Sequence, residues 1–332
     1  MISTIYIEDE VAAHPRTLEI LERFPEATRI SCERYGEIFN RKSQNFRLQK
    51  KQPALILAKK HKGTVLPTPK QYGIGAEHNY YFSHMLNCLY DCRYCFLQGM
   101  FQSAHYVLFI NYEDFIENMQ TSLAQHEDQA VHFFSGYDCD SLALDPVTEF
   151  TGAFLPFFES NPRALLELRT KSTQIRSLLK RDPIQNCVIA FSFTPEKIAA
   201  ALEHKAPNVE KRLNAIGDLQ NAGWQIGLRF DPLIYTKDYE QEYAALFDDI
   251  FKKIDIDLLH SVSLGSFRLP KAYFRKVEKL YPDEKLFASP IAEEDNNLGY
   301  PADIRNGMLE YCKNIILEQV PADKFFPCHE SI

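Results

Sequence analysis

The 332-residue chain lacks any apolar run approaching the roughly 18 residues that suggest a membrane span. Its first residues, MISTIYIEDE, are acidic where a secretion signal would be basic and then apolar. Internal repeats and low-complexity tracts are also missing. With 45% apolar and 25% charged residues, the composition is typical of a globular protein, and we expect a cytoplasmic one.

Basic residues are in deficit, because the net charge is −8 at pH 7. That balance argues against a protein whose whole surface binds nucleic acid. Residues 41–70 are the exception, with nine Lys or Arg and no Asp or Glu. Such a segment is either an electrostatic footprint for a polyanion or a solvated basic loop, and both interpretations remain open. Under the first, the candidate nucleic-acid contacts are Lys50, Lys51, Lys59 and Lys60.

Eight cysteines do not indicate a disulfide framework in a cytoplasmic chain. Three of them, Cys88, Cys92 and Cys95, lie within eight residues at C-x3-C-x2-C spacing. Clustered thiolates are soft ligands for zinc or for an iron–sulfur cluster. Zinc needs a fourth ligand, for which His84 is a candidate. A [4Fe–4S] cluster on three thiolates instead leaves one iron open for a chelating ligand, and the spacing favours this interpretation.

Short apolar runs alternate with helix-like patterns, as expected for βα units around a parallel sheet. The expected strands are 106–110, 131–135, 165–170, 188–193, 225–230 and 258–264. Six units are too few for a closed eight-stranded barrel, so we predict an α/β fold with an open, partial (β/α)6 TIM-like barrel. We assign residues 76–270 to this barrel. An N-terminal extension (1–75) precedes it, and a helical segment (271–332) follows and packs on it.

Polar residues follow several of the expected strands, at the edge where such barrels carry out their chemistry. Residues 136–141 (GYDCDS) come directly after the second strand. Lys171 follows the third strand, Ser192 lies near the end of the fourth, and Asp231 follows the fifth. We expect these residues and the cysteine loop to face one cavity.

The cysteine loop resembles that of the spore photoproduct lyase family, within the radical S-adenosylmethionine (SAM) superfamily. Residues 87–98 read NCLYDCRYCFLQ, with the same cysteine spacing, a tyrosine before the third cysteine and an aromatic-Leu-Gln after it. The resemblance extends over most of residues 50–280. It implies a radical SAM barrel that holds a [4Fe–4S] cluster on Cys88, Cys92 and Cys95 and binds SAM. The implied partners are DNA with a thymine–thymine lesion and an electron donor such as flavodoxin or ferredoxin.

The resemblance also implies roles for single residues. Cys139 matches the cysteine that donates a hydrogen atom to the last thymine radical, and Tyr94 matches a tyrosine that helps to regenerate SAM. The residues matched to the SAM site are Phe96, Ser141, Lys171, Ser192 and Asp231. Arg268 and Lys271 fall where the family contacts DNA. Without the resemblance, Cys139 is interpreted as a buried strand-end cysteine and Lys171 as a salt-bridge partner.

Phe96 departs from the family, which usually has a second tyrosine at this position. Phenylalanine has no phenolic hydrogen, so hydrogen transfer would depend on Tyr94 or on a substitute such as Tyr137. The departure leaves a second hypothesis open, a radical SAM enzyme that acts on a modified nucleoside, RNA or a peptide. A third hypothesis is a metal-binding protein without enzymatic activity.

Overall fold

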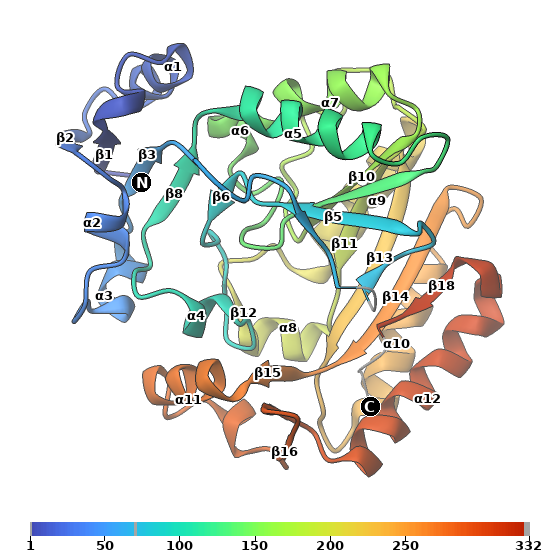
Figure 1. Ribbon diagram of the computed structural model, residues 1–332. Coiled ribbons are helices and arrows are strands. Elements are labelled where there is room, and N and C mark those ends of the chain that lie inside the picture. Colours follow the sequence, from blue (N-terminus) through green and yellow to red (C-terminus); the bar gives the residue numbers. More distant parts are fainter. Residues whose placement is uncertain (1, 70–71, 329–332) are drawn as a thin grey trace.

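Two large β-sheets organise the chain, whose computed structural model describes residues 2–69 and 72–328 (Figure 1). Within these ranges the larger sheet has eight strands in the order β18-β14-β13-β11-β10-β9-β5-β4. Its neighbouring strands are parallel except for the β4–β5 pair. The bounds are β4 (Leu66–Pro67), β5 (His78–Phe82), β9 (Val131–Ser135), β10 (Ala164–Thr170), β11 (Cys187–Ser192), β13 (Gln225–Leu233), β14 (Leu259–Ser266) and β18 (Phe325–Pro327).

Helices cover one face of this sheet, and aromatic side chains fill the contact (Figure 1). The ring of Phe82 in β5 lies 5.3 Å from that of Phe154, and the rings of Phe230 in β13 and Phe247 are 5.0 Å apart. The helices are α5 (Tyr112–Ala124), α6 (Asp145–Thr148), α7 (Phe150–Ser160), α8 (Glu196–Leu202), α9 (Val209–Asn221), α10 (Tyr239–Phe251) and α12 (Ala302–Gln319). Parallel strands with an outer layer of helices confirm the predicted partial barrel.

Successive residues of a strand point to opposite faces of the sheet. Phe230 packs against the helices, so its neighbour Arg229 points to the other face, where charged side chains lie. Glu167 of β10 and Arg229 of β13 are fully buried there, with Glu167 Oε2 and Arg229 Nη2 2.7 Å apart. Arg229 also donates to Ser261 Oγ at 2.8 Å. Gly227 leaves room for the guanidinium, since a Cβ at this position would lie 2.8 Å from Arg229 Nη2. Burial acts to raise the pKa of Glu167, but the charges of Arg229 and Arg169 and the hydrogen bond from Arg229 together hold that pKa at about 2.

Two buried histidines predict a loss of stability in mild acid. Burial lowers the pKa of His84 and that of His132 to about 3, compared with about 6.5 in an unfolded chain. Below about pH 6.5 the unfolded chain binds protons that the folded chain does not. The free energy of unfolding should therefore fall by about 1.4 kcal/mol per pH unit for each histidine, down to about pH 3. Urea unfolding between about pH 7.5 and 5 measures this slope, which His132→Phe should roughly halve; an unchanged stability over that range would contradict it.

A second sheet forms an N-terminal layer, in the strand order β2-β1-β3-β8-β6. Its strands are β1 (Thr4–Glu8), β2 (Thr28–Cys32), β3 (Leu55–Ala58), β6 (Met85–Leu86) and β8 (Tyr106–Phe109). Beside them lie η1 (Asp9–Val11), α1 (Pro15–Arg23), α2 (Gly36–Phe39) and α3 (Phe46–Lys51). β8 is the strand expected at 106–110, but it pairs with β3 in this sheet. In the barrel, the position beside β9 that was expected for β8 is occupied by β5. The sheet assignment was wrong because an apolar run indicates burial but not the partner strand.

The C-terminal part combines helices with strands, whereas the sequence analysis expected a helical segment from residue 271. β15 (Arg268–Pro270), β16 (Ala292–Glu294) and β17 (Asn297–Gly299) form a small antiparallel sheet beside α11 (Lys271–Leu280). The short helices η3 (Lys285–Ala288) and η4 (Ala322–Lys324) flank α12, and β18 then pairs with β14 of the barrel. Within the described ranges, no helix has the length and apolar character needed to cross a membrane.

Candidate active site

The three cysteines lie on the loop between β6 and β8, two strands of the N-terminal sheet. The loop contains β7 (Asp91–Cys92) and α4 (Leu97–Met100). β7 pairs antiparallel with β12 (Glu203–His204), which follows α8 and sets Cys92 opposite Glu203. Asn87 begins the loop with a φ of 68°, and its side-chain amide donates to two backbone carbonyls at 2.8 and 2.7 Å. The loop is therefore held at its start and in its middle.

The three thiols lie close enough to influence one another's ionisation. Cys92 is buried, and Cys88 and Cys95 are half-buried. Burial raises the pKa of Cys88 to about 12, with a smaller contribution from the Cys95 thiol. Burial also raises the pKa of Cys92 and of Cys95, and the Lys171 ammonium opposes both rises. Lys50 opposes the rise in the pKa of Cys88 and of Cys95 in the same way. Two cations therefore favour thiolates in this loop.

The donor set fits an iron–sulfur cluster better than a zinc ion. Among the described residues (2–69 and 72–328), no three His, Cys, Asp or Glu side chains are placed to hold a single metal ion. His84, the candidate fourth zinc ligand, stacks on Phe150 with 3.9 Å between ring centroids and belongs to the aromatic core. Three thiolates on one short loop can hold three corners of a [4Fe–4S] cluster and leave one iron open.

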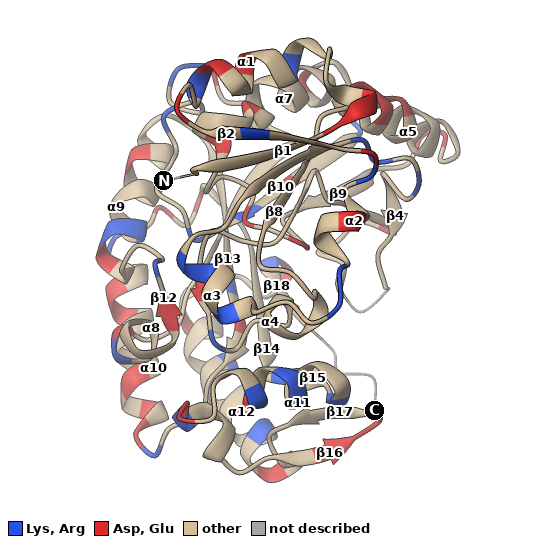
Figure 2. Ribbon diagram, turned by 90° about the vertical axis from the view of Figure 1, so that its left-hand side faces the viewer, with Lys and Arg blue, Asp and Glu red and all other residues tan. Residues whose placement is uncertain are grey.

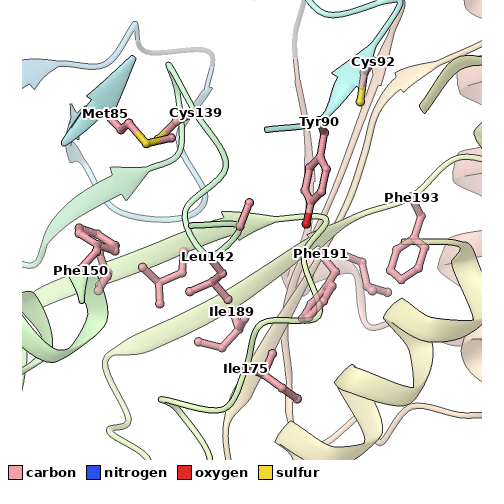
Figure 3. Packing of buried hydrophobic residues seen from close by; sticks show 14 of the residues in the cluster. Met85, Tyr90, Cys92, Cys139, Leu142, Phe150, Ile175, Ile189, Phe191 and Phe193 are labelled. Carbon is pink, nitrogen blue, oxygen red and sulfur yellow. The ribbon is translucent and has the colours of Figure 1, made fainter. Parts of the chain in front are cut away.

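Cys139 approaches the cysteine loop from the end of a different strand, β9. Its side chain is 6% exposed and lies beside Met85 (Figure 3). Burial raises the pKa of Cys139 well above its usual range, and the neighbouring Cys88 thiol adds to the rise. The Cys139 thiol therefore keeps its hydrogen at neutral pH. Gly136 begins this turn at a φ of 91°, and a Cβ there would lie 2.7 Å from Ser141 Oγ.

Asp140 fastens the Cys139 turn to the end of β10. Its carboxylate accepts hydrogen bonds from Thr170 Oγ1 and from the Lys171 backbone N–H, both at 2.7 Å. It also accepts from two backbone N–H groups of its own turn, at 3.0 and 2.9 Å. Asp140 thereby fixes Cys139 and Lys171 relative to each other. Asp140 gave no sequence signal of its own beyond its place in the polar turn.

Glu203 is the centre of a second buried network, which the sequence analysis missed. The Tyr94 hydroxyl donates to Glu203, and the Arg212 guanidinium forms a short ion pair with it. Thr194 Oγ1 donates to Glu203 Oε1 at 3.1 Å, and the Lys171 ammonium lies 4.0 Å from the same oxygen. Burial raises the pKa of Tyr94 well above its usual range, and the Glu203 charge adds to this effect. Glu203 gave no sequence signal, because its partners come from separate elements.

An aromatic cluster flanks the same loop on the sheet face away from the helices. The Phe96 ring lies 5.3 Å from the Tyr137 ring, which lies 4.7 Å from the Tyr81 ring. Tyr137 is 49% exposed, so a phenol is accessible directly beside Phe96. The role of Tyr137 as a substitute for the missing tyrosine stays a prediction.

A family model described as "Spore photoproduct lyase" matches residues 70–299, which is more than half of the chain. The chain belongs to the spore photoproduct lyase family. The spore photoproduct lyase of Bacillus subtilis (strain 168) is 23% identical over 202 residues, which make up 60% of this chain and 59% of that protein. That of Clostridium acetobutylicum is 22% identical over 212 residues, or 63% of this chain and 62% of that protein. The aligned part therefore spans less than two thirds of these relatives.

Solved structures of the spore photoproduct lyase family have the same fold. A mutant with bound AdoMet and dinucleoside spore photoproduct matches with a TM-score of 0.84 at 17% identity, over 100% of this chain and 99% of that chain. A second mutant with dinucleoside spore photoproduct also matches with a TM-score of 0.84 at 17% identity and with the same coverage. At this identity the match establishes the architecture.

The other residues matched to the family's SAM site lie at neighbouring strand ends. Ser192 is buried at the end of β11, and Asp231 of β13 is partly exposed. Arg268 Nη1 lies 3.5 Å from Asp231 Oδ1. Ser141 Oγ donates to Ser135 Oγ at 3.0 Å. These residues thus lie at the ends of β9, β11 and β13, and both their shared cavity and their SAM contacts stay predictions.

The basic segment does not present its lysines on one surface. Lys50 is buried against the cysteine loop, and Lys60 donates to the Ser83 carbonyl at 3.3 Å. Lys59 pairs with Glu10 at 2.8 Å, whereas Lys51 is exposed on α3. Figure 2 shows basic residues on α3 and α11 and acidic residues on β16. The structure contradicts phosphate contact by Lys50, because helix periodicity turns it inward while its neighbour Lys51 faces outward. Lys70 lies outside the described residues.

The two C-terminal candidates for DNA contact have acidic partners. Arg268 pairs with Asp231, and Lys271 Nζ lies 2.6 Å from Glu293 Oε2. Arg268 also donates to Tyr72 Oη at 3.2 Å. A phosphate group would have to compete with these carboxylates, so DNA contact by Arg268 and Lys271 stays a prediction.

Proposed function

We propose that this protein is a radical SAM lyase that repairs a spore-photoproduct-type thymine–thymine lesion in DNA. Family membership supports the reaction class, and the observation that carries the proposal is the position of Cys139. A buried, protonated thiol lies beside a loop of three cysteines, although the two come from different strands. A hydrogen donor that acts after a radical reaction must lie near the cluster loop and must still carry its hydrogen.

Cys88, Cys92 and Cys95 would hold the [4Fe–4S] cluster in this proposal. The cluster and SAM would together supply the radical chemistry that removes a hydrogen atom from the lesion. Cys139 would give the hydrogen of its S–H to the last thymine radical and become a thiyl radical, which the tyrosine relay would return to the thiol. The buried Tyr94 hydroxyl is held by Glu203, which fixes the ring orientation beside the loop.

Lys171 would bind the SAM carboxylate as a point charge. Its ammonium lies 5.5 Å from the Tyr94 ring centroid and 4.0 Å from Glu203, and its backbone is fixed by Asp140. Ser141, Ser192, Asp231 and Phe96 would line the rest of the SAM site. DNA and an electron donor such as flavodoxin or ferredoxin would be the partners, in the cytoplasm.

Replacing Lys171 with methionine should weaken SAM binding about tenfold to a hundredfold. A hydrogen bond to a charged group contributes about 1.5–3 kcal/mol, and methionine keeps most of the side-chain volume without the charge. Anaerobic equilibrium dialysis with labelled SAM measures the Kd. Lys197→Met, whose side chain is 81% exposed on α8, is the matched control and should bind SAM like the wild type. Equal affinity of both variants would remove Lys171 from the SAM site.

The reaction class is tested by anaerobic reconstitution with iron and sulfide, followed by reductant and SAM. We expect a [4Fe–4S] spectrum and 5′-deoxyadenosine that increases when lesion-bearing dinucleotide is added. Cys92→Ala should abolish both, whereas Cys187→Ala, a buried cysteine of β11, should retain both. Zinc without iron in anaerobically purified protein would overturn the proposal.

A second function is favoured by Phe96, which replaces the tyrosine usual in the family. A radical SAM enzyme for a modified nucleoside, RNA or a peptide would form 5′-deoxyadenosine without repairing the lesion. The same experiment therefore separates the two functions.

A further inference from the structure

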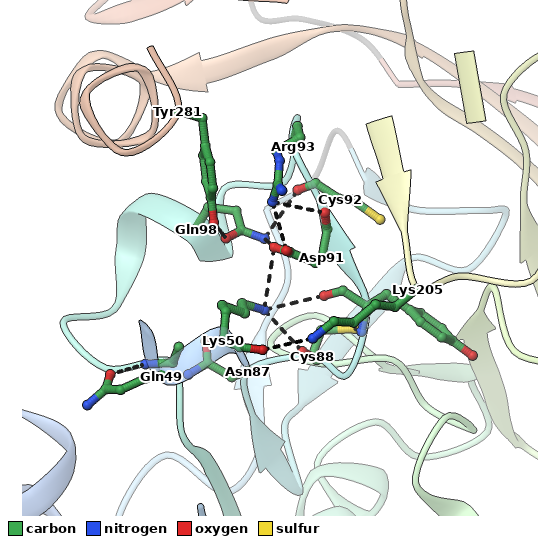
Figure 4. A network of polar contacts seen from close by, with 12 residues as sticks. Gln49, Lys50, Asn87, Cys88, Asp91, Cys92, Arg93, Gln98, Lys205 and Tyr281 are labelled. Atoms are coloured by element: carbon green, nitrogen blue, oxygen red, sulfur yellow. Dashed lines mark hydrogen bonds and ion pairs between the residues drawn. The ribbon is translucent and has the colours of Figure 1, made fainter. Parts of the chain in front are cut away.

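Lys50 of α3 inserts a buried ammonium group into the cysteine loop (Figure 4). The residue is 6% exposed, and its Nζ donates to the Cys88 carbonyl at 3.3 Å and to the Tyr90 carbonyl at 3.4 Å. Both acceptors belong to the loop itself. The cation therefore comes from the N-terminal layer but is directed at the segment that carries the three cysteines.

The charge of Lys50 is only partly neutralised. Its nearest carboxylate oxygen, Asp91 Oδ1, is 4.0 Å from Nζ. Asp91 is engaged more closely by Arg93, with 2.8 Å between Nη1 and Oδ2, and it accepts from Gln98 at 2.9 Å. Removing an ammonium from water costs several kcal/mol unless a nearby negative charge compensates. Thiolates on the loop, or a group bound to them, would add further negative charge beside the lysine.

Lys50 is also held in place by contacts to its backbone and to its ammonium group. Its own carbonyl accepts a hydrogen bond from Lys205 Nζ at 2.8 Å, just after β12 (Figure 4). The Phe46 ring flanks the ammonium at 5.9 Å. The next residue, Lys51, points away from the loop and is exposed. Two adjacent lysines on one helix thus have opposite environments, which provides an internal control.

We propose that Lys50 is the fixed counter-charge of the cluster on Cys88, Cys92 and Cys95 and makes its reduction more favourable. The inference depends on the proposed function only for the identity of the group on the cysteines. One-electron reduction adds a negative charge to the cluster, and a cation held at a fixed short distance inside the protein stabilises that added charge. Lys50 contacts neither substrate nor SAM in this role, so it acts on the electron-accepting step and not on the lesion.

The test is a redox titration of the reconstituted cluster without SAM or DNA. The EPR signal of the reduced cluster is measured at each potential. Lys50→Met and Lys50→Gln remove the charge, and Lys50→Arg retains it. Lys51→Met is the matched control. We expect the equilibrium constant for reduction to fall about tenfold in both neutral variants, which corresponds to about 1.4 kcal/mol. Lys50→Arg should recover most of this loss, and Lys51→Met should titrate like the wild type.

Iron and sulfide content distinguish a change in potential from a loss of the cluster. Loss of the cluster from both neutral variants, with a full cluster in Lys50→Arg, would also show that the charge is required. A neutral variant that keeps its cluster and titrates like the wild type would overturn the inference. Loss of the cluster in Lys50→Arg as well would overturn it too, because packing would then explain the effect. Neither the redox titration nor the iron and sulfide content requires lesion repair. If the repair assay failed, both measurements would still test the role of Lys50.

Discussion

Replacing Cys139 with alanine is expected to lower the yield of repaired thymines at least about tenfold while 5′-deoxyadenosine still forms. A tenfold loss corresponds to about 1.4 kcal/mol in the barrier of the affected step. The thiol is buried and protonated, and it lies beside Cys88 without belonging to the three-cysteine loop. Its removal should therefore leave the cluster and SAM cleavage intact and stop only the last hydrogen transfer.

The measurement is a quenched time course in which both products are quantified by liquid chromatography and mass spectrometry. Cys187→Ala removes a thiol of the same size from a fully buried position on β11 and serves as the control. It should keep the wild-type ratio of thymine to 5′-deoxyadenosine. If Cys139→Ala lowered both products equally, Cys139 would have a structural role; if it lowered neither, the donor would be another residue.

Replacing Glu167 with leucine is expected to lower the free energy of unfolding by about 3–5 kcal/mol. The Arg229 guanidinium would then be left in the fully buried centre of the sheet without its carboxylate. The Ser261 hydroxyl, 2.8 Å from Arg229 Nη2, is neutral and cannot replace that charge. Urea unfolding at neutral pH measures the loss.

The double variant Glu167→Leu with Arg229→Leu separates the cost of an unpaired charge from the value of the pair. Two apolar side chains leave no buried charge, so the double variant should be more stable than Glu167→Leu alone. Glu159→Ala is the surface control, because Glu159 pairs with Arg181 at 2.8 Å but is 58% exposed. It should cost less than about 1 kcal/mol. A double variant less stable than the single one would contradict the burial argument.

The barrel strands could be predicted from the sequence because each is a short apolar run next to a polar strand end. β9 matches the expected range 131–135 at both ends. The run at 106–110 was also a strand, but its sheet was wrong, since β3 in the N-terminal layer is an equally buried partner. β18 was missed because Phe325–Pro327 is too short to show a pattern.

The site could be predicted only where a local sequence pattern marks its residues. The three cysteines have a diagnostic spacing, and Cys139 follows a strand. Glu203 and Lys50 reach the cysteine loop from β12 and α3, and no local pattern indicates such contacts. Lys50 was assigned to the wrong surface because a run of basic residues does not show which of them point inward.

Repair of the dinucleoside lesion in heavy water tests the central claim most directly. The protein is first incubated in D2O so that the Cys139 S–H exchanges with solvent, and SAM, reductant and lesion are then added. The account predicts two restored thymines, one of which carries a single deuterium that is absent from the product of Cys139→Ala. Formation of 5′-deoxyadenosine without any restored thymine would contradict the account and favour a different substrate.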